Sequence, residues 1–480
     1  MSHAEPIAVQ PDRPKRRRRH RLIALGALVV LFAGLVEAHR AFGRHRLARA
    51  IAEADRLDPG WRTDQLEARR AAVAGDRNGA LRLLEAARLA EGTANSAVIL
   101  DRLRIQSYVD MTEADVSELG TMLQEESAAL EAARRLADTP EGRYPIATRT
   151  APGRQLPVRD GAVVMIWRLL TADAAIRAHD GDAEGALRAV HAMLNLARSI
   201  GDEPTEFAQW LRMAWGIGAA RFVEHVLARG EPSDEALARL QDAFRAELET
   251  PRLLTALRAL RAESFDRSEQ LRVGELDPER FGAVYVRTLA ADPGGPPGWA
   301  YNWMKDGWYR DNQATLIETL DRLVEAAKAP DLERRRVFAA VNDARDRLAP
   351  YHLASQRFLL TFHPSSKASG LATLDDRRRI YEGCAVVLLA AGRYRRARGH
   401  LPESLDALVP AYLKALPRAP YGNGRFRSAR RDGALVVYGV DARGSDMNGD
   451  VLRPGRYHGN EGLRLLDVRD RRRPTAPSSP

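Results

Sequence analysis

The residues of this sequence whose types and spacing could do chemistry lie in an acidic loop near the C-terminus. Asp446, Asn448 and Asp450 carry side-chain oxygens at alternate positions. Asp441 stands just before them, at the end of a predicted strand. A curved backbone aims alternate side chains at one point, and Ca²⁺ prefers several oxygen ligands of this kind. The spacing therefore predicts a calcium site formed by Asp441, Asp446, Asn448 and Asp450.

The same loop departs from the EF-hand calcium motif at two positions. Val451 stands where an EF-hand has its invariant glycine, and Tyr457 stands where it has a bidentate glutamate. The loop is therefore not an EF-hand, and its oxygens would bind calcium weakly, as extracellular sites do. An exposed Asn-Gly turn with solvated acids is the alternative interpretation of these residues.

No other motif in the sequence specifies a catalytic residue or a cofactor. The sequence has no phosphate-binding glycine loop, no Gly-x-Ser-x-Gly and no His-Glu-x-x-His. The single cysteine, Cys384, excludes an internal disulfide and a multi-cysteine metal site. It lies on an apolar helical face, which predicts a buried structural thiol. The histidines are scattered, with His179 and His191 wrongly spaced for one metal-binding helix face. These observations favour a chain that is not an enzyme.

The net charge of +10 is concentrated at the N-terminus. Residues 1–21 form a basic tail with seven basic and two acidic side chains, which accounts for +5. The rest of the chain mixes both signs and has no stripe of basic and aromatic residues, so we expect no nucleic-acid partner. With 480 residues, of which 45% are apolar, the chain is long enough to bury sizeable cores.

An apolar segment follows the basic tail directly. Leu22–Val36 has no polar side chain and would span roughly 22 Å as a helix, less than the ~30 Å hydrocarbon core of a bilayer. The segment 22–38 is either an uncleaved membrane anchor with snorkelling arginines or a signal peptide cleaved near Ala38. A helix-compatible pattern that continues beyond residue 38 favours the anchor. The excess of basic charge before the segment predicts a cytoplasmic N-terminus, with the bulk of the chain outside the cytoplasm.

Helical periodicity dominates the body of the chain, residues 39–374. Two segments rich in proline and glycine, near 139–157 and 291–310, predict long loops within it. The second segment holds the densest aromatic cluster of the chain: Trp299, Tyr301, Trp303, Trp308 and Tyr309. We interpret this cluster as a loop packed on the helical core, and a ligand or partner contact is the alternative.

The body also contains an internal echo. The motif Gly-Asp-x-x-Gly-Ala-Leu-Arg occurs in Ala74–Ala90 and again in Asp180–Ala197, each time between helical runs. It resembles the turn and second helix of a tetratricopeptide-type hairpin. The resemblance implies matching turns at Gly75 and Gly181 and matching close-packed sites at the alanines of the two motifs, Ala80 and Ala186. The spacing of the two copies is not a multiple of the tetratricopeptide period, so a plain irregular helical domain is the alternative.

The C-terminal region carries a more specific arrangement. A helix pattern leads into Leu401-Pro-Glu-Ser-Leu405, followed by Leu416-Pro-Arg-Ala-Pro-Tyr421, a strand pattern and the acidic loop. This order, over about 380–452, resembles the globular head of the major pseudopilins of type II secretion. The resemblance implies an α+β head over 375–468, a bacterial envelope location and calcium in the loop. It stops at the head, because the N-terminal segment lacks the Gly-Phe-Thr-x-x-x-Glu arrangement of prepilins.

Together these patterns predict a mainly α fold. It has a single N-terminal membrane helix, a large all-α helical-hairpin body, a small C-terminal α+β head with a short antiparallel sheet, and a disordered tail at 469–480. We expect a non-catalytic envelope protein of the bacterial inner (cytoplasmic) membrane. Its helical body would bind an unidentified protein partner, in a secretion-type assembly. The alternative is an envelope enzyme or small-molecule-binding protein with a site between the helical body and the head.

Overall fold

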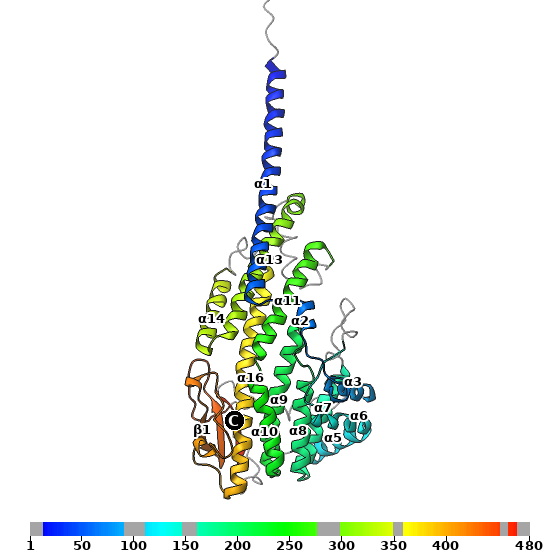
Figure 1. Cartoon of the computed structure of the whole chain (residues 1–480), viewed down its shortest axis with the longest axis vertical. Coiled ribbons are helices and arrows are strands. Elements are labelled where there is room, and N and C mark those ends of the chain that lie inside the picture. Colours follow the sequence, from blue (N-terminus) through cyan, green and yellow to red (C-terminus); the bar gives the residue numbers. More distant parts are fainter. Residues whose placement is uncertain are drawn as a thin grey trace, which may run out of the picture. The chain divides into compact units, whose positions relative to one another are not determined.

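The computed structural model describes residues 13–90, 111–145, 161–275, 298–348, 359–451 and 459–467. The chain is mainly α-helical and ends in a short antiparallel sheet, as predicted (Figure 1). The predicted tail at 469–480 and most of the predicted loop at 139–157 lie outside the described residues. The α-helices in the described part are α1 (Arg13–Leu57), α2 (Thr63–Ala68), α3 (Gly79–Leu89), α5 (Glu113–Glu125), α6 (Ser127–Arg134), α7 (Gly161–His179), α8 (Ala183–Arg198), α9 (Glu206–Arg229), α10 (Asp234–Glu249), α11 (Arg252–Val273), α13 (Gly298–Lys328), α14 (Asp331–Leu348) and α16 (Leu359–Arg398). The strands are β1 (Arg427–Arg431), β2 (Ala434–Gly439) and β3 (Glu461–Leu466).

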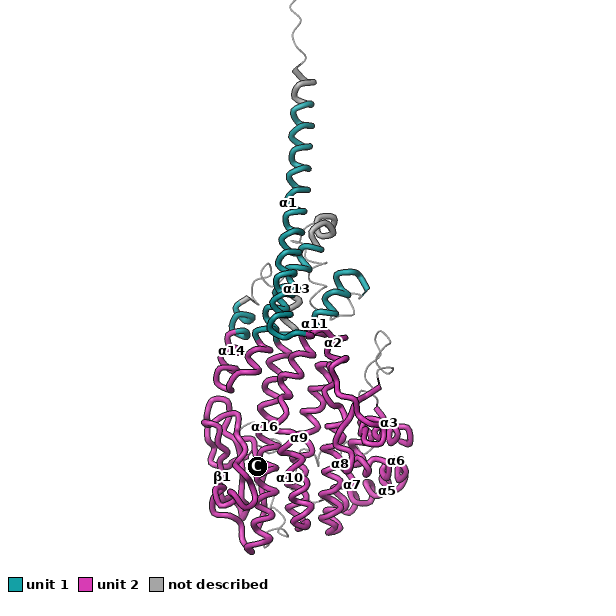
Figure 2. The backbone as a smooth tube through the Cα atoms, viewed as in Figure 1, with its two compact units in different colours: residues 1–59, 264–322, 341–365 teal, residues 60–263, 323–340, 366–480 magenta. Residues whose placement is uncertain are grey.

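The chain divides into two compact units (Figure 2). Unit 1 consists of residues 1–59, 264–322 and 341–365, and unit 2 consists of residues 60–263, 323–340 and 366–480. All of the predicted head therefore belongs to unit 2, together with most of the predicted helical body.

In unit 1, the C-terminal half of α1 packs closely against α13. A Cβ added to Gly43 would lie 2.5 Å from the carbonyl oxygen of Gly307, so the two backbones meet where neither residue has a side chain. Arg46 of α1 forms ion pairs with Asp311 and with Glu318, the latter at 2.6 Å. Close backbone packing and ion pairs therefore fix this half of α1 to the folded part of unit 1.

The apolar half of α1 is exposed. This helix is long and apolar enough to cross a membrane. Its leucines, valines and isoleucine from Leu22 to Leu35 are 58–72% exposed, whereas Phe32 is half-buried and Val36 is only 4% exposed. Packing against the rest of unit 1 therefore begins near the end of the apolar segment.

In unit 2, the helices α7, α8 and α9 pack side by side in chain order (Figure 1). Asp182 caps α8 by accepting a hydrogen bond from the N–H of Gly185 at 2.8 Å. Ser233 caps α10 in the same way, as its position in the sequence predicts. Each of these N-caps starts a helix within a few residues of the end of the helix before it. The short connections allow consecutive helices to bury a continuous core.

The echo motif is preserved at its packing position and not at its turn. Ala80 and Ala186 are both fully buried, as expected for matching close-packed sites. The expectation of matching glycine turns is wrong. Gly181 adopts a left-handed φ of 84°, whereas Gly75 begins a 3₁₀ turn, Gly75–Arg77. The physical reason is that the first copy begins its helix later, after the N-cap residue Asn78.

The sheet has the order β1-β2-β3, with both pairs antiparallel. The central strand β2 is buried along its whole length. Gly383 of α16 allows the ring of Phe426 to approach closely, since a Cβ there would lie 2.4 Å from the ring. Cys384 is fully buried, as predicted, and its thiol donates to the carbonyl oxygen of Val437 in β2. The sheet therefore packs on α16 and shares the core of the helices.

The aromatic segment differs from its sequence-based prediction. Residues from Gly298 onward form the start of α13, so the loop predicted near 291–310 does not extend over the aromatic cluster. The helix breakers of this segment end at Gly298, and the residues that follow are compatible with a helix. Trp308 and Tyr309 contact each other edge to face, with ring centroids 5.1 Å apart.

Candidate functional site

The acidic loop after β2 is held by its own side chains. One oxygen of Asp441 accepts hydrogen bonds from the N–H groups of Arg443 and Ser445, both at 2.8 Å. The hydrogen bond from Ser445 contributes most to lowering the pKa of Asp441 below its usual range. Asp446 accepts the N–H of Asn448 and the hydroxyl of Tyr438, also at 2.8 Å each. Both carboxylates therefore stabilise turns of the loop.

Three further residues organise this loop, and the spacing of the acids did not point to them. Asn460 accepts a hydrogen bond from the N–H of Met447 and donates one to the carbonyl oxygen of Ser445. Arg431 of β1 donates to the carbonyl oxygen of Asn448 at 2.7 Å. The third residue is Tyr438, whose pKa rises to about 12 because of burial and the hydrogen bond to Asp446. These hydrogen bonds therefore attach the loop to β1, to β2 and to the residue before β3.

These contacts bear on the predicted calcium ligands Asp441, Asp446, Asn448 and Asp450. In the described part of the chain, no three or more His, Cys, Asp or Glu side chains are grouped so that they could hold a metal ion. Asp441 and Asp446 each use one carboxylate oxygen for the turn hydrogen bonds. Calcium binding by this loop therefore stays a prediction from the sequence, and it is open to direct test.

Calcium is expected to raise the thermal unfolding midpoint of the full chain if the loop binds it. For a weak site, millimolar calcium would stabilise the fold by about 1–2 kcal/mol through mass action. The measurement compares melting in calcium with melting in chelator, for the wild type and for an Asp446→Asn, Asp450→Asn double variant. An equal shift in both proteins, or no shift in the wild type, would contradict the prediction.

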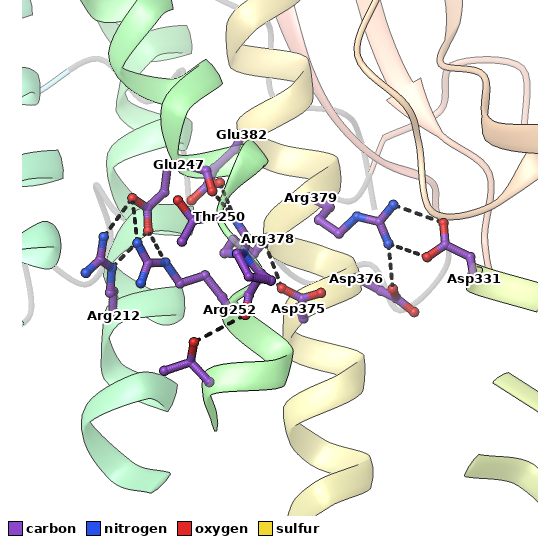
Figure 3. Close-up of polar contacts among 12 residues, drawn as sticks. Arg212, Glu247, Thr250, Arg252, Asp331, Asp375, Asp376, Arg378, Arg379 and Glu382 are labelled. Atoms are coloured by element: carbon purple, nitrogen blue, oxygen red, sulfur yellow. Dashed lines mark hydrogen bonds and ion pairs between the residues drawn. The ribbon is translucent and has the colours of Figure 1, made fainter. Parts of the chain in front are cut away.

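A buried ion-pair network lies in unit 2 (Figure 3). Arg212 of α9 and Arg252 of α11 both donate to the carboxylate of Glu247 of α10, Arg212 at 2.8 and 2.9 Å. Arg378 of α16 donates to Asp375 and Glu382, each at 2.8 Å. Arg378 also donates to the carbonyl oxygen of Glu247 at 3.1 Å, which joins the two halves of the network.

A second cluster continues this network along α16. Asp376 accepts from Arg334 at 2.6 Å and from the hydroxyl of Tyr421 at 2.7 Å. Arg379 donates to both oxygens of Asp331 at 2.7 and 2.9 Å. The ion pairs therefore connect α16 to α14, and the hydrogen bond from Tyr421 connects α16 to the segment before the sheet.

The two buried glutamates of the network are held in different protonation states. Burial by itself would raise the pKa of Glu247, but the charges of Arg212 and Arg252 outweigh it and hold that pKa well below its usual range. Burial raises the pKa of Glu382 to about 8 against the opposing charge of Arg378, and the negative charge of Glu247 adds to the effect of burial. One oxygen of Glu382 has no hydrogen-bond partner. We therefore expect Glu247 to be charged and Glu382 to be protonated near neutral pH.

Replacing Glu382 with glutamine is expected to remove a pH dependence of stability. Between the ordinary glutamate pKa of the unfolded chain and the raised folded pKa, the folded state holds one proton more. The stability from this proton is present below the unfolded pKa and is lost as pH rises, by up to about 1.4 kcal/mol per pH unit. Denaturant unfolding at about pH 5, 6 and 7 would show the wild type weakening relative to Glu382→Gln. A difference that is constant over this range would contradict the assignment.

The ion-pair network joins helices to one another, because each of its arginines donates to at least one carboxylate within the protein. Arg212, Glu247 and Arg252 come from the consecutive helices α9, α10 and α11, whereas Arg378 comes from α16, more than a hundred residues later. Pairs such as Arg378 and Glu382 have the spacing of an ordinary surface pair. No sequence motif could have identified them as a buried group.

Comparison with known proteins gives no relative for this chain. No protein-family model matches it. No curated protein and no solved structure matches it either.

Proposed function

We propose that this chain is a non-catalytic docking protein of the bacterial envelope. Residues 22–38 anchor it in the inner (cytoplasmic) membrane, with the N-terminus in the cytoplasm and the bulk of the chain outside. The helical body binds a protein partner, within a secretion-type assembly. The secretion link is supported by the order of helix, turn, sheet and acidic loop, which resembles a pseudopilin head.

The observation that carries the proposal is the exposure of the apolar half of α1. Its leucines, valines and isoleucine face outward around the helix: Leu22, Ile23, Leu25, Leu28, Val29, Val30, Leu31 and Leu35. Each such side chain gains about 1.5–3 kcal/mol on leaving water for an apolar environment. A helix that is apolar all round and uncovered by protein is typical of a membrane span. The basic tail before it supports the proposed orientation.

A rigid aromatic pair on α9 supports the docking part of the proposal. Trp210 is 41% exposed and stacks on Phe207, with ring centroids 5.8 Å apart and an angle of 19° between the rings. Exposed tryptophans that neighbouring side chains hold in place supply much of the binding energy in protein interfaces. We propose that this pair lies in the contact with the partner.

Cysteine labelling tests the orientation. The only natural cysteine, Cys384, is fully buried and should react little with the label, so labelling of an engineered cysteine can be measured directly. In spheroplasts, a membrane-impermeant maleimide is expected to label Met447→Cys, because Met447 is 37% exposed. A Ser2→Cys variant is expected to react only after permeabilisation. The reverse pattern would overturn the orientation.

Photo-crosslinking in cells tests the docking. A photoreactive amino acid at Trp210 is expected to give one discrete adduct, which mass spectrometry can identify. The same amino acid at Leu332, which is 58% exposed on α14, serves as the control. No adduct at Trp210, or the same adducts at both positions, would contradict a specific partner contact there.

A further inference from the structure

A groove lies between α8 and α10 in unit 2, with about 230 Å³ of space. Leu187 and Leu240 line it and are each only 1% exposed, so they form an apolar floor. Arg188 of α8 and Arg239 of α10 also line the groove, and both side chains are more than half exposed. The groove thus combines a small apolar floor with two guanidinium groups.

Both arginines have partners that an incoming anion could replace. Arg188 pairs with Asp138 at 2.5 Å, and Arg239 pairs with Glu235 at 2.8 Å. All four side chains are more than half exposed. Exposed pairs of this kind are weak, because water and salt screen their charges. The two guanidinium groups are therefore available to a ligand at little cost, and their planar forks match a carboxylate.

The electrostatics inside the groove favour an anion. Burial and then the charge of Arg198 are the largest causes that lower the pKa of His191 to about 4; Asp138 opposes them, and Arg188 and Arg239 lower it by smaller amounts. His191 is thus neutral at neutral pH and lies in a positive local field. The acid in the lining, Glu184, uses both carboxylate oxygens to accept hydrogen bonds from Ser233 at 2.9 and 2.8 Å. Its charge is therefore directed to the start of α10.

We propose that this groove binds a carboxylate carried on a short apolar stem, with the stem on Leu187 and Leu240 and the carboxylate between Arg188 and Arg239. The space suits a ligand of a few heavy atoms. This is the chemistry of a glutamate side chain, or of a small dicarboxylate whose second carboxylate stays in solvent, and in the first case the inference rests on the proposed docking function.

The groove also distinguishes the two copies of the echo motif. Leu187 and Arg188 belong to the second copy, where leucine is buried in the groove floor. In the first copy the corresponding leucine, Leu81, is 39% exposed, and Arg82 donates to the backbone oxygen of Asp76. The same sequence motif therefore builds a groove at its second position and an ordinary helix surface at its first.

Ligand-observed saturation-transfer NMR on the full chain in detergent tests the proposal, with glutarate as the probe. Arg188→Gln and Arg239→Gln are each expected to weaken glutarate binding by about tenfold, which corresponds to ~1.4 kcal/mol. The matched control is Arg245→Gln, on the same helix as Arg239, because Arg245 forms an exposed pair with Asp242 and is not part of the groove lining. It is expected to leave the affinity unchanged. The neutral diamide of glutarate is expected not to bind.

Two outcomes would overturn the proposal: equal glutarate affinity in all four proteins, or equal binding of the diamide. A capped peptide with one central glutamate, compared with its glutamine counterpart, separates the two ligand sources. Stronger competition by the glutamate peptide than by glutarate identifies a partner side chain, and weaker competition identifies a free small acid. The glutarate result is independent of the crosslinking at Trp210, so the groove and the docking function succeed or fail separately.

Discussion

Replacing Leu28 and Val30 with aspartate is expected to release this chain from membranes. Both side chains lie in the middle of the apolar segment and are 61% and 72% exposed. An aspartate at the centre of a membrane helix costs about 2.5–3.5 kcal/mol. Two of them would cost about 5–7 kcal/mol, a change of roughly 10⁴–10⁵ in the equilibrium between membrane and water.

Fractionation of cells, with a carbonate wash of the membranes, measures this release. Leu332→Asp is the matched control, since Leu332 is 58% exposed but belongs to α14 and not to the apolar segment. The control is expected to stay in the membrane fraction with the wild type. Retention of the double variant after the wash would contradict the anchor. A soluble wild type whose mature chain begins after residue 38 would instead establish a cleaved signal peptide.

Replacing Glu247 with glutamine is expected to cause the largest loss of stability of any single change in the buried network. Arg212 and Arg252 both direct their guanidinium groups at its carboxylate, and all three side chains are at most 7% exposed. The glutamine would leave two buried positive charges without their common counter-charge. Breaking a buried ion pair in this way costs about 3–5 kcal/mol.

Denaturant unfolding in detergent measures this loss at neutral pH. Asp242→Asn on the same helix is the control, because its pair with Arg245 is 40–63% exposed and its loss should change stability by less than about 0.5 kcal/mol. Glu382→Gln is a second comparison, and it should be mild because that carboxyl is already protonated. Equal effects of Glu247→Gln and Glu382→Gln would show that the charges are distributed differently.

Local patterns predicted the parts of the fold that depend on neighbours in sequence. The sequence pattern predicts strands at 425–428, 435–440 and 463–468, and the three observed strands lie within a few residues of those positions. Alternation and turn residues suffice for this, because a hairpin is a local structure. The N-cap at Ser233 and the buried thiol of Cys384 followed from equally local signals.

The remaining features depend on which segments meet in space. Glu247 and Arg378 look like ordinary charged helix residues until α10 and α16 are placed together. Likewise, Asn460 and the acidic loop are separated by a stretch of chain, so the spacing of the acids could not reveal that Asn460 fixes them. The sequence pattern did not predict the start of α13 at Gly298, because the glycines and prolines that extend to that residue are typical of a loop.

The close contact between α1 and α13 gives the anchor a mechanical property. His39 lies against Gly307, where an added Cβ would be 2.7 Å from the imidazole, so packing begins almost as soon as the apolar segment ends. Under the membrane anchoring proposed above, no flexible tether would separate the bilayer from the folded protein. A bilayer of unsuitable thickness is usually accommodated by tilting the spanning helix. Such a tilt of α1 would be transmitted to α13, so that bilayer thickness would set the angle between α13 and the bilayer plane.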